Sequence, residues 1–226
     1  GGTDDARLAQ LNAAVLDPDI HLIIALRGGY GISRLLPAID FDAIAASGKI
    51  IVGFSDVTAL HMGLMARTGA LSYAGPMVAG DFGAEEPVPF TLDDFWACLA
   101  GPTHTIRETV SGNPQLDVRG TVWGGNLAMI GSLLGTPYFP QIDGGILWLE
   151  DISEHPYRVE RLLLQLMQAG VLERQQAVVL GDFSGYRLGP LDNGYDFEAM
   201  LAYVRRTLPV PVLTGLSFGH IPRRVT

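Results

Sequence analysis

Cysteine is nearly absent from the 226-residue chain, and the one present, Cys98, has no partner for an internal disulfide. Because small secreted proteins often depend on disulfides, this scarcity favours a reducing compartment. Cys98 lies in an apolar stretch and is predicted to be a packed core thiol. No apolar run approaches the roughly 20 residues of a membrane span, and no basic-then-apolar signal opens the chain. The sequence therefore predicts a cytoplasmic protein without a membrane partner.

Basic residues are also few, with 15 Lys and Arg against 24 Asp and Glu, which gives a formal net charge of −9. Nucleic acids and anionic membranes attract basic patches, so neither is an expected partner. The chain has no Cys/His cluster with tetrahedral zinc spacing and no His-Glu-x-x-His, which disfavours a metallopeptidase. We predict no metal and no cofactor. The 48% of hydrophobic residues is enough to build a folded core.

The first 84 residues alternate amphipathic segments with short, nearly continuous apolar runs. Such runs are typical of buried parallel strands, and the alternation predicts a parallel-sheet α/β domain over residues 1–84. The predicted helices are 4–16, 32–39 and 57–68, and the predicted strands are 20–26, 49–54 and 71–74.

The alternation of helical and apolar segments ends near Gly83. Residues 85–110 are interpreted as a linker region before a C-terminal domain over 111–226. Alternating polar and apolar residues over 103–122 predict antiparallel strands. The other predicted helices are 92–100, 126–134, 157–168 and 197–207, and the other predicted strands are 146–149, 177–180 and 210–214.

A serine stands at the sharp turn between a predicted strand and the helix that follows it, in Gly53-Phe54-Ser55-Asp56-Val57. The nucleophile elbow Gly-x-Ser-x-Gly places its serine in this way and aims the N-terminus of the helix at the bound group. The match is partial because residue 57 is Val. The alternative is that Ser55 or Asp56 only caps the helix.

A glycine-rich turn, Arg27-Gly28-Gly29-Tyr30-Gly31, follows the first predicted strand. Glycines allow the backbone to approach a ligand and present its N–H groups. The turn could hold an oxyanion or a phosphate. It lacks, however, both the Gly-x-x-x-x-Gly-Lys-Ser/Thr spacing and the Gly-x-Gly-x-x-Gly spacing of known phosphate-binding loops. The alternative is a tight turn without a ligand.

Two further strand ends carry titratable side chains, in Leu149-Glu150-Asp151 and Phe218-Gly219-His220. A serine nucleophile needs a base, and the base needs an orienting acid, so Ser55, Glu150 and His220 form a candidate triad. Asp182 is the rival acid. The alternative for His220 is a solvated loop residue. The remaining histidines are less suited to act on Ser55: His21, His61, His104 and His155.

The chain resembles the LD-carboxypeptidases, a family of serine peptidases that includes the murein tetrapeptide carboxypeptidases. The resemblance runs along essentially the whole chain, with its blocks in family order. The blocks are residues 27–36, 53–60, Trp123-Gly-Gly-Asn-Leu127, 149–151, Pro156-Tyr-Arg-Val-Glu-Arg161 and 218–220.

The resemblance implies a role for each matching residue. Ser55 would be the nucleophile, and Glu150 would orient His220 as general base and then general acid. The backbone N–H groups of Asp56 and Gly29 would form the oxyanion hole. The family also implies an α/β N-terminal domain, a β-rich α+β C-terminal domain and a homodimer.

The implied substrate is a murein tetrapeptide from cell-wall recycling in the bacterial cytoplasm, cut at the amide that releases the terminal D-Ala. An exopeptidase must hold a free carboxylate, so a cation is expected near the site. The candidates are Arg27, Arg34 and Arg158, with ordinary surface ion pairs as the alternative. Tyr30 and Trp123 could line the substrate channel or could only pack.

The family pattern extends beyond this sequence at both ends, with a strand–helix–strand section before residue 2 and further residues after Thr226. The expectation is therefore of a fold trimmed at both ends. Two other functions stay open. One is a related peptidase that cleaves a peptide-nucleotide antibiotic and confers self-immunity, and the other is a non-enzymatic, flavodoxin-like binding module.

Overall fold

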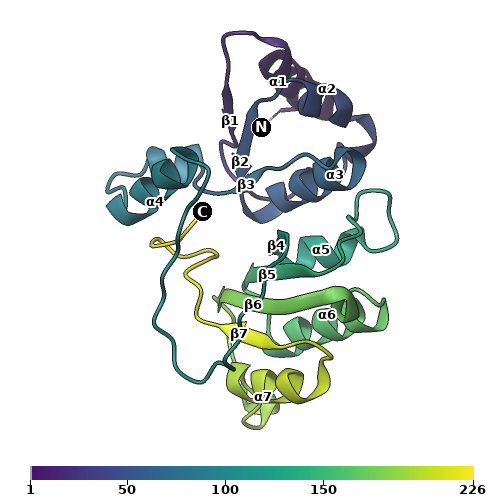
Figure 1. The fold of residues 1–226 in the computed structure, drawn as a ribbon, viewed down its shortest axis with the longest axis vertical. Helices are drawn as coiled ribbons and strands as arrows, with labels where there is room; N and C mark the ends of the chain where they lie inside the picture. The colour runs from purple at the N-terminus through teal and green to yellow at the C-terminus, as the bar shows by residue number, and fades with distance from the viewer. Residues whose placement is uncertain (1) are drawn as a thin grey trace. The chain divides into compact units, whose positions relative to one another are not determined.

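The protein divides into two compact units in a computed structural model that describes residues 2–226 (Figure 1). Unit 1 runs to His104 and also takes in Gly135–Gln141 and Val225–Thr226. Unit 2 comprises Thr105–Leu134 and Ile142–Arg224. Neither unit is therefore a single continuous segment of the chain.

Unit 1 is built on a parallel sheet in the order β1-β2-β3. Its strands are β1 (Leu22–Ile24), β2 (Ile50–Gly53) and β3 (Tyr73–Ala74). Its helices are α1 (Asp4–Leu16), α2 (Phe41–Ala46), α3 (Thr58–Thr68) and α4 (Pro89–Leu99). Ile51 and Val52 of β2 are buried, as the continuous apolar run predicts for a central parallel strand.

Short polar side chains fix where the first helices begin. The side chain of Thr3 accepts the backbone N–H of Ala6 at 3.2 Å, and that of Asp40 accepts the N–H of Ala43 at 2.9 Å. These N-caps satisfy N–H groups that the first helical turn leaves without partners. The helix predicted over 4–16 is confirmed with the same bounds.

The helix predicted over 32–39 is wrong. Only a 3₁₀ turn, Leu36–Ala38, forms in this stretch. Pro37 has no N–H to donate within a helix, and the N–H of Ile32 is donated to the carboxylate of Asp56 at 2.9 Å. The helix that connects β1 to β2 lies later in the chain, at α2.

Unit 2 is a four-stranded sheet in the order β4-β5-β6-β7, and every neighbouring pair is parallel. The strands are β4 (Val122–Asn126), β5 (Gly145–Ile152), β6 (Gln175–Ser184) and β7 (Val212–Thr214). The helices α5 (Leu127–Leu133), α6 (Pro156–Gln168) and α7 (Phe197–Thr207) connect them in turn. Right-handed crossovers between strands in sequential order place all three helices on one face, which Figure 1 shows.

The antiparallel strands predicted over 103–122 are wrong, because residues 103–121 form no ladder. The segment instead contacts the edge of β7 through a side chain. The Asn113 amide donates to the carbonyl of Thr214 and accepts its N–H, both at 2.9 Å, as a neighbouring strand would. The α/β class with two sheets is confirmed, but the β-rich α+β description of the second half is corrected to a parallel α/β layer.

The core of unit 2 lies between its sheet and its helices. Leu147 and Leu149 of β5 are fully buried, as are Val159, Leu163 and Leu166 on one face of α6. This spacing is the apolar stripe of an amphipathic helix. No helix within residues 2–226 is both long enough and apolar enough to cross a membrane.

Candidate active site

Ser55 occupies a strained turn between β2 and α3. Its φ angle is 62°, in the left-handed region that residues with a side chain rarely adopt. A 3₁₀ turn over Ser55–Val57 leads directly into α3. This is the strand–turn–helix geometry of a nucleophile elbow, where strain presents the serine hydroxyl.

Glycines make room for this turn. A Cβ on Gly28 would lie 2.8 Å from the Cβ and 3.0 Å from the Oγ of Ser55, so the glycine turn approaches the serine side chain closely. A Cβ on Gly53 would lie 2.9 Å from the Val57 side chain. Val57 therefore packs over the strand end where the full motif has its second glycine.

Asp56 ties the serine turn to the glycine turn. Its side chain is 5% exposed, and Oδ2 accepts the N–H of Ile32. Gly29 and Gly31 have φ angles of 95° and 133°, which only glycine adopts without strain. Gly31 is held further by its carbonyl, which accepts a hydrogen bond from Arg7 Nη1 at 3.1 Å. The two turns are thus built as one assembly.

His61 is engaged away from the serine. Its Nε2 lies 2.9 Å from the carbonyl oxygen of Gly53, and a carbonyl only accepts, so Nε2 carries the proton. Burial lowers the pKa of His61 to about 4, although the hydrogen bond to Gly53 opposes the shift. A neutral histidine fixed to the end of β2 has a structural role, in agreement with its exclusion as the base.

Glu150 and His220 form a close pair. Nδ1 of His220 lies 2.7 Å from Oε2 of Glu150, which is 1% exposed. An acid that receives Nδ1–H fixes the ring so that Nε2 is the reactive nitrogen. Asp182, the rival acid, instead accepts hydrogen bonds from the hydroxyl and N–H of Ser184.

The His220 loop is held by close backbone contacts to the ends of β5 and β6. Phe218 accepts the N–H of Asp182 through its carbonyl at 2.7 Å. Gly219 has a φ angle of 137°, and a Cβ there would lie 2.9 Å from Asp182 Cβ and 3.2 Å from Glu150 Cβ. The glycine before His220 is therefore required for the histidine to reach Glu150.

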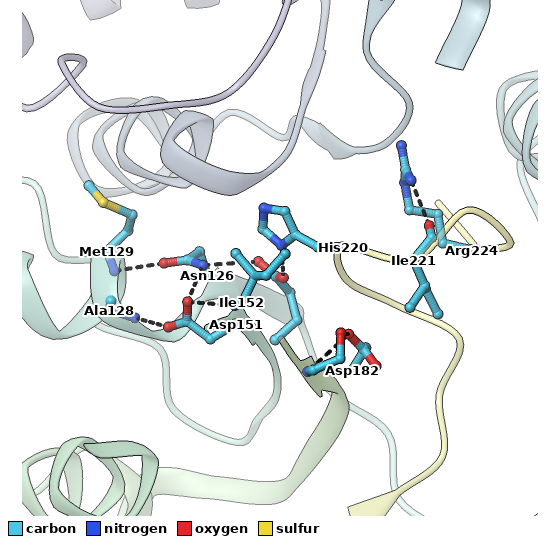
Figure 2. A network of polar contacts seen from close by, with 11 residues as sticks. Asn126, Ala128, Met129, Asp151, Ile152, Asp182, His220, Ile221 and Arg224 are labelled. Atoms are coloured by element: carbon cyan, nitrogen blue, oxygen red, sulfur yellow. Dashed lines mark hydrogen bonds and ion pairs between the residues drawn. The ribbon is translucent and has the colours of Figure 1, made fainter. Parts of the chain in front are cut away.

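A polar network continues from this pair, as Figure 2 shows. Asn126 Nδ2 donates to Glu150 Oε1 at 3.3 Å and to Asp151 Oδ1 at 2.9 Å. Asp151 also accepts the N–H groups of Ala128 and Ile152, both at 2.9 Å. Burial raises the pKa of Asp151 to about 6, because lost solvation outweighs these three hydrogen bonds, and the Glu150 charge adds to the rise.

The arginine candidates differ in their surroundings. Arg27 is exposed, and its guanidinium lies over the glycine turn, 2.9 Å from where a Cβ on Gly29 would be. Arg34 pairs with Asp4 at 2.8 Å. Arg158 is exposed on α6 and lies 3.6 Å from Glu154. Arg27 is thus the candidate that lies beside the serine and glycine turns.

The two aromatic candidates also differ. Tyr30 is 83% exposed in the glycine turn, where it is open to a ligand. Trp123 is 4% exposed, and its Nε1 donates to Gln175 Oε1 at 2.8 Å. This geometry favours the packing interpretation for Trp123.

The structure therefore brings the candidate residues together in two groups. Ser55, Asp56 and Gly29 share one assembly in unit 1, while Glu150 and His220 pair in unit 2. The sequence reasoning missed the residues behind the acid, Asn126 and Asp151. The signal was available, because Asn126 lies in the block of residues 123–127 and Asp151 follows the proposed acid directly. No group of three or more His, Cys, Asp or Glu residues in the described chain could hold a metal ion.

Comparison with known families matches both parts of the chain. Residues 1–75 match the LD-carboxypeptidase N-terminal domain, and residues 119–226 match the LD-carboxypeptidase C-terminal domain. The chain belongs to the LD-carboxypeptidase family of peptidases.

Individual relatives fall into two groups. A solved muramoyltetrapeptide carboxypeptidase from Oxalobacter formigenes is 48% identical with a TM-score of 0.96, over 99% of this chain and 76% of that one. A Bacillus subtilis protein named "Probable murein peptide carboxypeptidase" is 32% identical over 97% of this chain and 70% of its own length. The microcin C7 self-immunity protein MccF of Escherichia coli is 31% identical over 97% of this chain and 72% of its own length.

Proposed function

We propose that this chain is a serine carboxypeptidase that releases the terminal D-Ala from a murein tetrapeptide by hydrolysing the L-D amide. The observation that carries the proposal is the hydrogen-bonded pair of the buried Glu150 with His220, in a chain whose Ser55 lies in an elbow-like turn. The 48% identity to a muramoyltetrapeptide carboxypeptidase supports the substrate class.

In the proposed mechanism, Ser55 Oγ attacks the carbonyl carbon of the scissile amide while Nε2 of His220 accepts the hydroxyl proton. Glu150 keeps Nδ1 protonated and stabilises the imidazolium that forms. The backbone N–H groups of Asp56 and Gly29 would stabilise the oxyanion of the tetrahedral intermediate. Loss of one such donor typically lowers kcat by about 10²–10³-fold.

Collapse of the intermediate breaks the C–N bond, and His220 returns the proton to the leaving amine of D-Ala. The acyl-enzyme on Ser55 is then hydrolysed by water, with His220 again acting as base and then as acid. The mechanism requires Nε2 of His220 to reach Ser55 Oγ in the working enzyme. No cofactor takes part in these steps.

We assign recognition of the terminal carboxylate of the substrate to Arg27, with Tyr30 beside it. The position of Arg27 over the glycine turn supports this role, because a guanidinium binds a carboxylate through two parallel hydrogen bonds. Arg158, paired with Glu154, is the second candidate. We also propose that the protein is a homodimer and that it acts in the bacterial cytoplasm. Light scattering measures the oligomeric state.

The testing experiment measures D-Ala release from L-Ala-γ-D-Glu-meso-diaminopimelyl-D-Ala by wild type, Ser55→Ala and the control Ser72→Ala, which changes another serine of unit 1. We expect release by wild type and Ser72→Ala, and a loss of at least about 10³-fold in Ser55→Ala. Circular dichroism checks that all three proteins fold. Undiminished release by folded Ser55→Ala would contradict the nucleophile assignment.

The similarity to MccF supports a second candidate function, cleavage of a peptide-nucleotide antibiotic. One solved MccF structure, with a TM-score of 0.83 and 30% identity, is a complex with aspartyl sulfamoyl adenosine. The same three proteins are therefore assayed with that compound. Hydrolysis of it without D-Ala release would favour the immunity function, and hydrolysis of neither by folded protein would favour a binding module.

A further inference from the structure

Asn126 lies at the end of β4, directly opposite Glu150 in the parallel register of β4 and β5. It is 6% exposed, and its amide contacts partners on both sides. Nδ2 donates to Glu150 Oε1 and Asp151 Oδ1, while Oδ1 accepts the N–H of Met129 at 3.1 Å and caps α5. The helix cap and the two carboxylates therefore fix which side of the amide faces Glu150 (Figure 2).

Asp151 acts as the anchor of this arrangement. It is 4% exposed, and two backbone N–H groups, those of Ala128 and Ile152, hold its carboxylate in place. A carboxylate fixed by the backbone is a rigid acceptor for Asn126 Nδ2. The amide consequently keeps its donor side toward Glu150.

We propose that Asn126 is a positioning residue that orients the Glu150 carboxylate toward His220. The inference rests on the proposed function, in which His220 is the base. Since Nδ2 occupies Oε1 of Glu150, the carboxylate presents Oε2 to Nδ1 of His220. Without this donor, the Glu150 carboxylate would lose the hydrogen bond that fixes the rotation of its Oε1.

The charged groups around Glu150 come from several elements. Asp151 shares β5, Asp182 lies at the end of β6 across Gly219, and His220 lies on the final loop. Asn126 is a neutral donor that contacts both the Glu150 and the Asp151 carboxylates. Its replacement by a carboxyl group would add a third acid directly beside Glu150 and Asp151.

Two variants separate positioning from helix capping. Asn126→Ser keeps an oxygen that can cap α5 and removes the amide donor, while Asn126→Asp keeps the cap and adds a charge. We expect both to lower kcat by about 10-fold to 100-fold with KM nearly unchanged, because a hydrogen bond to a buried charge is lost. Asn126→Asp should also move the acid limb of the kcat/KM profile upward by about one pH unit, because added negative charge favours protonation.

The matched control is Asn113→Asp, which alters another hydrogen-bonded asparagine of unit 2 that caps the edge of β7. It should leave the pH profile unchanged. Thermal unfolding of all four proteins shows whether a lower kcat follows from lower stability. Wild-type kcat and an unshifted profile in both Asn126 variants would overturn the proposal.

Titration of the His220 ring by NMR gives a readout that does not need substrate. The titration midpoint should be higher in Asn126→Asp than in wild type. If wild type released no D-Ala, the proposed function would fail, and this titration alone would decide the positioning role. An unchanged midpoint in Asn126→Asp would overturn the positioning role whatever the activity.

Discussion

At the scale of single residues, the close approach of Gly28 to Ser55 makes a sharp prediction. Gly28→Ala places a methyl group 2.8 Å from the Cβ of Ser55, within the distance that real Cβ atoms avoid, so one of the two turns must move. A displacement of about 1 Å at a nucleophile lowers kcat by about 10²-fold. The measurement is D-Ala release at saturating substrate.

Gly101→Ala is the control, because a Cβ at Gly101 meets nothing within 4 Å. It should keep wild-type kcat. A Gly28→Ala protein with wild-type kcat would show that the glycine turn and Ser55 are not coupled as the structure indicates.

How much of the site the sequence could predict also depends on single residues. Ser55 follows β2, Glu150 lies near the end of β5 and His220 lies in the loop after β7. The sequence predicted the pairing of Glu150 with His220 by requiring an acid for the base, and the structure has the two side chains 2.7 Å apart. Asn126 lies in a block that matches the family, but the contact that makes it a site residue depends on the pairing of β4 with β5, which local sequence does not encode. The assignment of Ser55, Glu150 and His220 to catalysis is a proposal.

At the scale of elements, local patterns worked where a helix is amphipathic and capped. The helices over 4–16 and 197–207 were predicted with the observed bounds. β4 was missed because its centre is Gly124-Gly125, and glycine is poor at forming strands. A Cβ on Gly124 would collide with the carbonyl of Trp148 in β5. The neighbouring strand therefore requires glycine at this position.

His61 of α3, which contacts the end of β2, predicts that the stability of the fold depends on pH. His61 has a folded-state pKa of about 4, below its ordinary 6.5, so the unfolded chain binds the proton more tightly. Stability from this residue is present above pH 6.5 and is lost as pH falls toward 4. The loss is about 3 kcal/mol from the linkage of protonation to folding.

Urea unfolding of wild type and His61→Gln at pH 4, 5.5 and 7 measures this effect. The advantage of wild type over the variant should shrink as the pH falls. His21→Gln, which changes an exposed histidine at the start of the same sheet, is the control and should show a constant difference. A constant difference for His61→Gln as well would argue against a buried neutral histidine.

At the scale of the whole molecule, the buried side chains of His61 and Asp151 change the free energy of unfolding in opposite directions as the pH falls. Asp151 has a folded-state pKa of about 6, above its ordinary 3.8, so the folded protein binds the proton more tightly between these values. Its contribution to stability therefore increases as pH falls from 6 to 4, by about 3 kcal/mol. This gain offsets the loss from His61 over much of the same range.

Asp151→Asn should consequently lose stability more steeply than wild type between pH 6 and 4, while His61→Gln loses it less steeply. The slopes of the unfolding free energy against pH for the two variants should lie on opposite sides of the wild-type slope. Slopes on the same side would mean that one of the two groups titrates normally in the folded protein.

The division of the chain also has a consequence for its synthesis. Unit 1 includes residues 225–226, where the N–H of Thr226 is donated to Asp94 on α4 at 2.8 Å. A ribosome releases these residues only after all four strands of the second sheet. The contact between Thr226 and α4 can therefore form only after the four strands of the second sheet have been synthesised, so during translation α4 stays without it until then.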